Sequence, residues 1–370
     1  MKQNVCGLII ADDIRIQLGE LSRPRALSAV PFAGRYRLID FPLSNMVNSG
    51  ITTVGISTYY KYKSLMDHLG TGAAWDLDRK RSGLFMLPPY VNAETFIGTS
   101  GDDLSGVLSF YQSQRHDYVI VASSDYIINS TYDDLMEFHL AKQADISVYY
   151  KDDGEEPSSR KLILDLADDG KVRTVYDDPL NPPTRHQVVG AMLMETKLFV
   201  SILADTMARG QRDVDFYYFI KLCEHLNVYA KPYAKTVLRF TSIQDYFKAT
   251  LRLLRDEACR NELLGSSLPI YTKVKDEAPT YYSDGCIVEE SMISDGCVIQ
   301  GSVENCMLFR GVMVGPQAKL KNSIIFQDTQ ISEACELDHC IIDKDCVLRP
   351  GIQLVGQEAY PVVIGKGAVV

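Results

Sequence analysis

The sequence predicts an α/β fold in two parts: a mostly parallel sheet covered by helices, followed by a parallel β-helix. Three observations support this prediction. In roughly the first 240 residues, short apolar runs alternate with amphipathic stretches, which is typical of β-α-β units. From about Ser283 onward, single aliphatic residues recur every five or six positions instead. Between these parts, residues 242–264 have the apolar periodicity of a helix.

The apolar runs of the first part predict strands at residues 5–11, 54–58, 118–123 and 145–149. The amphipathic stretches predict helices at residues 40–49, 104–115 and 132–143. Parallel sheets of this kind bind ligands beyond the carboxyl ends of their strands. Three segments are therefore the candidates for a functional site: the one after Ala11, the one near Gly98 and the one after Ser123.

The repeat of the last part fits neither a helix nor an ordinary alternating strand. Small or polar residues fill the gaps between aliphatic positions, and the near-six period persists through a dozen repeats. Short strands joined by tight turns would place one aliphatic side chain per face inside a three-sided β-helix. Coils of about 18 residues would give roughly four coils. The alternative is a β-sandwich of irregular short strands. We place the domains at 1–240 (sheet), 241–280 (helix and linker) and 281–370 (β-helix).

Composition argues against several classes of protein. The net charge of −10 lacks the basic excess that nucleic-acid or anionic membrane surfaces favour. No stretch approaches 18 consecutive apolar residues, and the N-terminus lacks the pattern of a signal peptide. We therefore expect a cytoplasmic protein with no nucleic-acid partner and no membrane association.

The cysteines are nine in number and contain no C-x-x-C pair. Six of them fall in the C-terminal quarter. Metal ligation is one interpretation, and small thiols that fill the tight turns of a repeat are the other. We expect the second, and hence no metal site.

A long stretch of the sheet domain resembles a known family. Residues 25–45, RALSAVPFAGRYRLIDFPLSN, closely resemble a segment of bacterial ADP-glucose pyrophosphorylases (glucose-1-phosphate adenylyltransferases). The match continues through VNSGI (47–51), YKYKSLMDHL (60–69), Gly98-Thr99 and SSDYI (123–127) into the repeat. The resemblance implies a nucleotidyltransferase-like (Rossmann-like) domain with a left-handed β-helix. It also implies a family reaction that joins ATP and glucose 1-phosphate into ADP-glucose and pyrophosphate.

The phosphate-binding loop of that family is not intact here. Active members have G-G-x-G-x-R after the first strand, because glycines let backbone N–H groups approach the triphosphate. Counted back from Arg25 without a gap, the first two glycine positions hold Asp12 and Asp13. The third glycine position holds Arg15, and the arginine position holds Gln17. Carboxylates would then face phosphate oxygens, which is unfavourable. A misplaced loop is the alternative, but residues 5–25 contain no other glycine-rich stretch.

The same comparison places further losses at groups that handle phosphate or metal. A family lysine falls at Leu27, and the lysine that holds the sugar phosphate falls at Asp178. Of two aspartates that hold Mg²⁺ in the family, the first matches Asp125 and the second falls at Arg239. Asp125 is either a vestigial ligand or a structural group at a strand end. Remnants of the substrate-binding segments are Gly98, Thr99 and Gly190.

These losses beside an intact scaffold resemble the non-catalytic GlgD-type subunits of some Gram-positive bacteria. The resemblance implies a regulatory subunit that assembles with a catalytic subunit, usually as a heterotetramer. No cofactor is then expected for this chain, and Mg²⁺ is expected only in the catalytic partner. An active adenylyltransferase with an atypical phosphate loop is the main alternative. An acyltransferase would need a histidine between coils, and the repeat offers only His339.

Basic residues crowd the segment 23–37. The resemblance places Arg25 and Arg37 at positions of an anionic effector site between the domains, and Arg35 lies beside them. Arginine binds phosphate groups well, so a phosphorylated effector is expected. Solvated or ion-paired surface arginines are the alternative.

Overall fold

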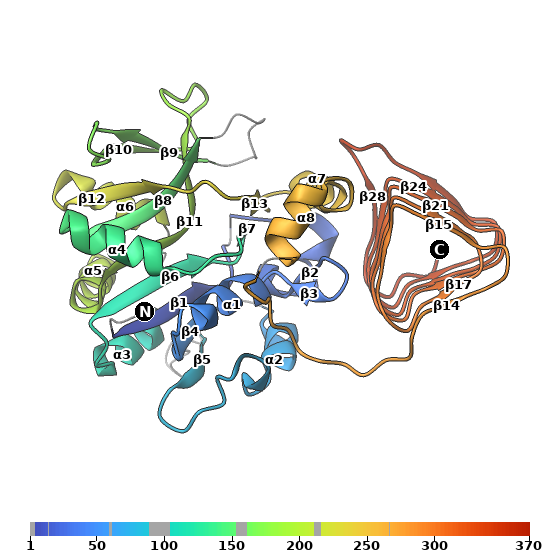
Figure 1. The fold of residues 1–370 in the computed structure, drawn as a ribbon, viewed down its shortest axis with the longest axis horizontal. Coiled ribbons are helices and arrows are strands. Elements are labelled where there is room, and N and C mark those ends of the chain that lie inside the picture. The colour runs from blue at the N-terminus through green and yellow to red at the C-terminus, as the bar shows by residue number, and fades with distance from the viewer. Residues whose placement is uncertain are drawn as a thin grey trace.

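The computed structural model describes residues 4–13, 15–58, 61–88, 104–152, 161–210, 216–265 and 267–370. Gly98 and Thr99 lie outside these ranges. A sheet domain covered by helices lies beside a triangular β-helix, and two further helices lie between them (Figure 1). The predicted α/β fold with a C-terminal β-helix is confirmed.

The main sheet has nine strands, in the order β10-β9-β11-β6-β1-β4-β5, with β8 and β12 attached through β11. Their bounds are β1 (Val5–Ile10), β4 (Thr53–Ser57), β5 (Gly83–Leu87), β6 (Tyr118–Ser123), β8 (Ile146–Asp152), β9 (Leu162–Leu166), β10 (Val172–Asp177), β11 (His186–Glu195) and β12 (Val228–Pro232). Strand β1 pairs in parallel with β4 and β6, while β11 joins β6 antiparallel. The four predicted strands are all present, and β6 has the predicted bounds.

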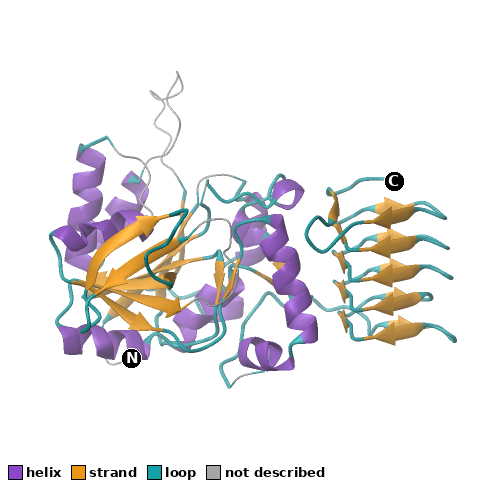
Figure 2. Cartoon of the chain, turned by 90° about the horizontal axis from the view of Figure 1, so that it is seen from above, coloured by secondary structure: helices purple, strands orange, loops and turns teal. Residues whose placement is uncertain are grey.

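Helices cover both faces of this sheet (Figures 1 and 2). They are α1 (Asp40–Asn48), α2 (Lys63–Leu69), α3 (Ser105–Ser113), α4 (Asp133–Lys142), α5 (Thr196–Ala208) and α6 (Phe216–Lys221). Neighbouring residues of β1 enter opposite cores: Ile9 packs with the cluster of Leu135, and Leu8 with that of Phe199. Burial on both faces explains why these strands are continuous apolar runs.

Short elements complete the sheet domain. They are the 3₁₀ turns η1 (Gly19–Leu21), η2 (Leu27–Ala29), η3 (Ala73–Trp75) and η5 (Leu222–Glu224), and the strand pairs β2 (Pro31–Phe32) with β3 (Tyr36–Arg37) and β7 (Tyr126–Ile127) with β13 (Leu238–Arg239). The second pair is antiparallel and brings distant parts of the chain together beside β6.

The segment predicted as one helix over residues 242–264 consists of two, α7 (Ile243–Arg255) and α8 (Glu257–Leu264). The single-helix prediction was wrong because Asp256 leaves helical geometry and caps α8, its carboxylate accepting the Cys259 N–H at 3.0 Å. Helix α7 buries Tyr246 and Phe247 in a core shared with Phe326 of the β-helix, so the two domains share one hydrophobic cluster.

The β-helix has three parallel sheets of five strands each. The first holds β14 (Tyr281–Tyr282), β17 (Val298–Ile299), β20 (Met313–Val314), β23 (Gln330–Ile331) and β26 (Val347–Leu348). The second holds β15 (Ile287–Glu289), β18 (Ser302–Glu304), β21 (Lys319–Lys321), β24 (Glu336–Asp338) and β27 (Gln353–Val355). The third holds β16 (Met292–Ile293), β19 (Met307–Leu308), β22 (Ile324–Ile325), β25 (Cys340–Ile342) and β28 (Val362–Ile364).

The structure corrects the expected number of coils. Each face carries five strands, not four, and Figure 2 shows them stacked beside the sheet domain. Lys319 pairs with Glu336, and Glu336 with Gln353, so these coils advance by 17 residues. The expected coil of about 18 residues was too long because the turns are tighter than a strict hexapeptide repeat requires.

Most of the clustered cysteines lie inside the β-helix. Cys297, Cys306, Cys335, Cys340 and Cys346 are buried among its aliphatic residues, and all cysteines are free. Burial raises the pKa of the Cys306 and Cys340 thiols to about 12, so they stay protonated at neutral pH. Within the described ranges, no cluster of three or more His, Cys, Asp or Glu side chains is arranged to hold a metal ion. None of the described helices has the length and apolar character that crossing a membrane requires.

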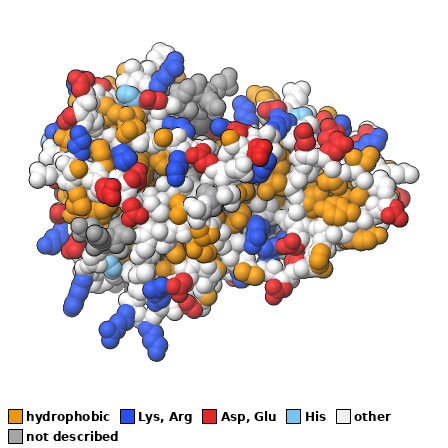
Figure 3. All heavy atoms as spheres, viewed as in Figure 1, with side chains coloured by type: hydrophobic (Ala, Val, Ile, Leu, Met, Phe, Trp, Pro, Cys, Tyr) orange, Lys and Arg blue, Asp and Glu red, His pale blue; other side chains and the backbone are white. Residues whose placement is uncertain are grey.

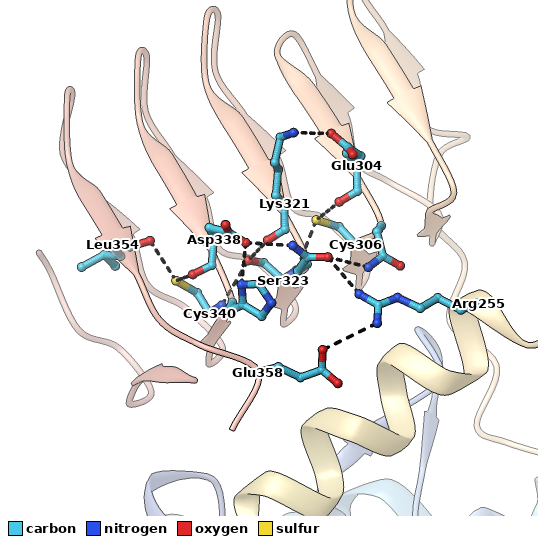
Figure 4. Close-up of polar contacts among 12 residues, drawn as sticks. Arg255, Glu304, Cys306, Lys321, Ser323, Asp338, Cys340, Leu354 and Glu358 are labelled. Carbon is cyan, nitrogen blue, oxygen red and sulfur yellow. Dashed lines mark hydrogen bonds and ion pairs between the residues drawn. The ribbon is translucent and has the colours of Figure 1, made fainter. Parts of the chain in front are cut away.

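A polar ladder on one corner of the β-helix faces the end of α7 (Figure 4). Asn305 Nδ2 donates to Asn322 Oδ1 at 2.7 Å, and Asn322 Nδ2 donates to Asp338 Oδ1 at 2.9 Å. Arg255 Nη2 donates to the same Asn322 oxygen at 3.1 Å, and its Nη1 lies 3.8 Å from Glu358 Oε2. The last turn of α7 is thereby tied to successive coils.

Candidate functional site

The carboxyl ends of β1 and β6 meet where the sequence predicted a functional site. The loop that includes residues 11–13 and 15–18 follows β1, and Asp125 follows β6. The pairing of β13 with β7 places Arg239 opposite Tyr126, directly beside Asp125. The topology therefore gathers the predicted phosphate loop and both predicted metal positions in one place.

Asp12 is a structural acceptor. One carboxylate oxygen accepts the backbone N–H of Leu27 at 3.0 Å, and the other accepts the Thr58 hydroxyl at 2.8 Å. These bonds tie the loop to η2 and to the end of β4. The carboxylate at the first glycine position of the family thus holds the loop to its neighbours.

Asp13 forms a forked ion pair with Arg15. Arg15 Nε lies 2.8 Å from Asp13 Oδ1, and Arg15 Nη2 lies 2.9 Å from Oδ2. The second and third glycine positions of the family therefore neutralise each other. Ile16 and Leu18 are buried in the core shared between the domains, while Gln17 is exposed. The burial of Ile16 and Leu18 therefore fixes the path of this loop, where the family uses flexible glycines.

Asp125 and Arg239 form a buried ion pair. Arg239 Nε lies 3.5 Å from Asp125 Oδ2, and their side chains are 11% and 5% exposed. The Ser123 hydroxyl donates to the other oxygen of Asp125. The guanidinium carbon lies 4.7 Å from the centre of the Tyr126 ring, which adds a cation–π contact. Asp125 is thus the partner of a cationic side chain.

The pKa values at this pair reflect burial and mutual attraction. Burial raises the pKa of Asp125, while Arg239 and the Ser123 hydrogen bond act to lower it. Burial acts to lower the pKa of Arg239, but Tyr126 and Asp125 outweigh that effect and hold it above its usual value. The guanidinium remains charged and supplies the counter-charge that a buried carboxylate needs.

Two further predicted positions have structural explanations. A Cβ atom on Gly190 would lie 2.5 Å from the Cβ atom of Tyr126, so glycine there lets the tyrosine pack against β11. Leu27, at the position of a family lysine, is buried in the core shared by the two domains. Both residues therefore serve packing.

Asp178, at the position of the sugar-phosphate lysine, lies just beyond β10, an edge strand of the sheet, and is exposed. Its backbone N–H donates to the Lys161 carbonyl at 2.7 Å. This contact closes the end of the antiparallel β9–β10 ribbon. Asp178 thus belongs to the end of that ribbon, and none of its described contacts joins it to the cluster around Asp125.

The residues at the family's metal position do not fit a divalent cation. Mg²⁺ requires several oxygen ligands in near-octahedral geometry. Here one oxygen of Asp125 faces a guanidinium, the other accepts a hydroxyl proton, and the second expected carboxylate is Arg239 itself. A cation at this position would meet a fixed positive charge.

A second candidate site lies between the domains. It is a cavity of about 170 Å³ that we call the interdomain pocket. Basic side chains from three parts of the chain line it: Arg35 and Arg37 near the β2–β3 pair, Lys273 and Lys275 of the linker, and Arg310 and Lys344 of the β-helix. Asp67 is the single acidic residue among the described lining residues.

Two of these basic groups are held in unfavourable surroundings. Arg310 is 7% exposed, and its Nε atom has no hydrogen-bond partner within the described chain. Burial, followed by the charges of Arg37 and Arg25, lowers the pKa of Lys344 to about 7. Burial of a cationic group is costly, and so is a buried donor without a partner, so an anion in this pocket would stabilise both side chains.

Of the three arginines predicted for an anionic effector site, Arg35 and Arg37 line this pocket and Arg25 does not. Arg25 is 4% exposed, and its Nη2 lies 2.9 Å from both carboxylate oxygens of the fully buried Asp343. Arg25 thus joins the sheet domain to the β-helix, and its role in an anion site stays a prediction. Sequence reasoning missed the four basic residues from the linker and β-helix because only folding brings them beside residues 35–37.

His339, the residue that an acyltransferase would need, has a structural environment. Its Nδ1 lies 2.7 Å from Asp338 Oδ1, and its ring centre lies 6.0 Å from that of Phe247 in α7. It therefore packs at the boundary between the domains.

Both parts of the chain are similar to known protein families. A family model for nucleotidyl transferases matches residues 16–239, and a model for the GlmU-like C-terminal hexapeptide region matches residues 279–360. The chain is 33% identical to glycogen biosynthesis protein GlgD of Bacillus subtilis (strain 168), over 98% of this chain and 96% of that protein. It is 30% identical to the glucose-1-phosphate adenylyltransferases of Bacillus cytotoxicus and Bacillus thuringiensis, over 95% of this chain and 94% of each enzyme.

Proposed function

The chain belongs to the nucleotidyl transferase family, with glucose-1-phosphate adenylyltransferases and glycogen biosynthesis protein GlgD among its relatives, and on this premise we propose that it is a regulatory, catalytically deficient subunit of a glucose-1-phosphate adenylyltransferase complex in glycogen biosynthesis. The observation that carries the proposal is the buried pair of Asp125 and Arg239 at the family's metal position. The proposal also places the chain in the cytoplasm, where reducing conditions keep thiols free.

The charges of the site support catalytic deficiency. Phosphoryl and nucleotidyl transfer depend on donors and cations that stabilise charge on the phosphates. In this chain Asp12 accepts the backbone N–H of Leu27 in η2, Arg15 is paired with Asp13, and Arg239 is paired with Asp125. These charged side chains are therefore engaged within the chain and not directed at a phosphate or a metal ion.

We propose that the partner is the catalytic subunit, in a heterotetramer, and that it docks on the first-coil end of the β-helix. Strands β14, β15 and β16 each pair with a single strand on their inner side, so their outer edges offer free backbone groups within the described fold. The large apolar residues Tyr281, Tyr282, Ile287 and Val288 of this coil are exposed. Figure 3 shows hydrophobic side chains gathered on the end of the β-helix turned toward the viewer. Another β-helix end, with matching strand edges, suits such a surface.

Mixing the two subunits tests this function. We expect the chain to co-elute with the glucose-1-phosphate adenylyltransferase of the same organism and to change its kcat or its response to effectors. Ile287→Lys should weaken association by about 10-fold or more, because an interface would bury its charge. The control is Val355→Lys, the same kind of change on the exposed last coil. Unaltered kinetics and separate elution would contradict the assembly, and equal effects of both variants would contradict the docking surface.

We further propose that the interdomain pocket binds a phosphorylated effector. The six basic side chains against one carboxylate, and the buried Arg310 Nε without a partner, support an anionic ligand. Because the pocket is lined from the sheet domain, the linker and the β-helix, a bound anion would link all three. Such a link is how an effector could act on an assembly made through the β-helix.

Lys344 predicts how anion binding depends on pH. Its pKa lies near 7 in the free protein, and an anion favours the charged ammonium. Binding therefore takes up a proton, and affinity should rise as pH falls from about 8.5 to about 6.5, by roughly 3- to 10-fold. Sulfate is the suitable probe because it keeps its charge over this range, and calorimetry provides the measurement.

Two variants control the pH experiment. Lys344→Gln should flatten the pH dependence, while Lys319→Gln, on the outer surface beside Glu336, should leave it unchanged. His68 also lines the pocket, but burial lowers its pKa below its usual value, away from that of Lys344. A pH dependence that survives in Lys344→Gln would refute the assignment.

A further inference from the structure

Arg239 sits among negatively charged groups at the end of the sheet. Asp125 contacts it directly, Asp245 of α7 adds to the attraction, and Asp13 of the loop acts on Asp125. The short ribbon of β7 and β13 lies next to α7 (Figure 1), and its pairing sets Arg239 opposite Tyr126, just beyond the carboxyl end of β6. One guanidinium thus lies among carboxylates from three separate parts of the chain.

We infer that Arg239 is a built-in cation that replaces a divalent metal ion as the counter-charge of Asp125, and that its removal uncovers a latent divalent-cation site. The inference deepens the proposed function, since a permanently filled metal position is one way to abolish catalysis while preserving the fold. It concerns the identity of the cation, and it makes no assumption about the partner subunit.

The surroundings of Arg239 are shaped for a guanidinium. Its planar group lies over the Tyr126 ring at 4.7 Å and directs Nε toward Asp125 Oδ2. Gly190 sets the position of the ring, because any larger residue on β11 would collide with Tyr126. Stacking on a ring and pairing at its edge suit arginine, whereas Mg²⁺ and Mn²⁺ require oxygen ligands all around.

The same geometry excludes a metal ion in the natural chain. A metal bound to Asp125 would sit about 2.1 Å from its oxygen, and the guanidinium nitrogen lies only 3.5 Å from Oδ2. Two cations would then share one buried carboxylate. Replacing Arg239 by aspartate removes the fixed charge and sets a second carboxylate opposite Tyr126, on the strand paired with β7. Asp125, the new carboxylate and water would offer the oxygen ligands that the natural chain lacks.

The test uses Mn²⁺ alone as the probe, with the full chain. Wild type and Arg239→Lys should bind no Mn²⁺ at this position, and Mn²⁺ should leave their thermal unfolding midpoints unchanged. Arg239→Asp should bind Mn²⁺ at least about 10-fold more tightly than wild type, seen as loss of the free-ion electron paramagnetic resonance signal, and Mn²⁺ should raise its unfolding midpoint. The matched control is Arg209→Asp, which also sets a new carboxylate beside an existing one, Asp205, but at the exposed end of α5.

A double-mutant cycle keeps the inference testable if Arg239→Asp does not fold. Arg239→Met should lower the unfolding midpoint by leaving Asp125 without its counter-charge, and Asp125→Asn with Arg239→Met should restore most of the loss. Wild type that binds Mn²⁺ as tightly as Arg239→Asp, a gain shared equally by Arg209→Asp, or Arg239→Met as stable as wild type would overturn it. Each outcome is independent of subunit mixing, so failure here leaves the regulatory proposal to its own test.

Discussion

The purified chain, supplied with ATP, glucose 1-phosphate and Mg²⁺, is expected to form ADP-glucose at least about 10³-fold more slowly than a catalytic relative. Removing a single preorganised charge-stabilising group from an enzyme lowers kcat by about 10²–10³-fold. Here the loop arginine position is Gln17, which is exposed, and the metal position holds the pair of Asp125 and Arg239. Two such losses acting on one transition state justify the expected factor.

Steady-state product formation, measured beside the relative under identical conditions, checks this expectation. Turnover in the ordinary enzyme range of about 1–10³ s⁻¹ would instead support an active adenylyltransferase with an atypical loop. The variant Asp125→Asn distinguishes activity of this chain from traces of a contaminating enzyme, because the substitution should leave contaminating activity unchanged. A rate that falls with this substitution would show that the site of this chain is catalytic.

Replacing Arg25 by methionine is expected to destabilise the protein by about 3–5 kcal/mol, because it leaves the buried carboxylate of Asp343 without its partner. Arg25 Nη2 contacts both oxygens of Asp343 at 2.9 Å, and Asp343 is fully buried. Asp343 also accepts the N–H of Lys344, so the pair stabilises the wall of the interdomain pocket. Urea-induced unfolding measures the change in free energy.

The control for Arg25 is an ion pair that faces water. Arg209→Met removes the partner of Asp205 on the surface of α5 and should cost less than about 1 kcal/mol. Changing both members of the buried pair, Arg25→Met with Asp343→Leu, should recover much of the loss because no buried charge remains. Equal stability of Arg25→Met and Arg209→Met would show that the buried pair does not hold the domains together.

The elements that the sequence predicted best are those whose burial is complete. Strand β6 (Tyr118–Ser123) was predicted with its bounds because burial on both faces makes it a continuous apolar run ended by polar residues. The helices around residue 256 were not separated because the apolar period continues across Asp256. Only the backbone geometry there turns that carboxylate into the cap of α8.

The sequence predicted which residues belong to the candidate site but not which side chains they contact. Counting back from Arg25 located Asp12, Asp13 and Arg15, and the family resemblance at residues 123–127 located Asp125. The partners of these side chains could not be predicted, since Thr58 lies 46 residues from Asp12 and Arg239 lies 114 residues from Asp125. A hydrogen bond between such distant residues exists only after the sheet has formed.

Residue types and their order along the chain predicted an altered phosphate loop, an arginine at the position of a metal aspartate, and a β-helix after the sheet domain, of which the structure confirms the β-helix. The chain carries these properties before it folds. Three other properties became visible only in the folded protein: Arg239 neutralises Asp125, Arg25 belongs to the domain boundary, and the linker and β-helix complete a basic pocket. Burial and the distance between charges decide those roles, and both arise only when distant segments pack together.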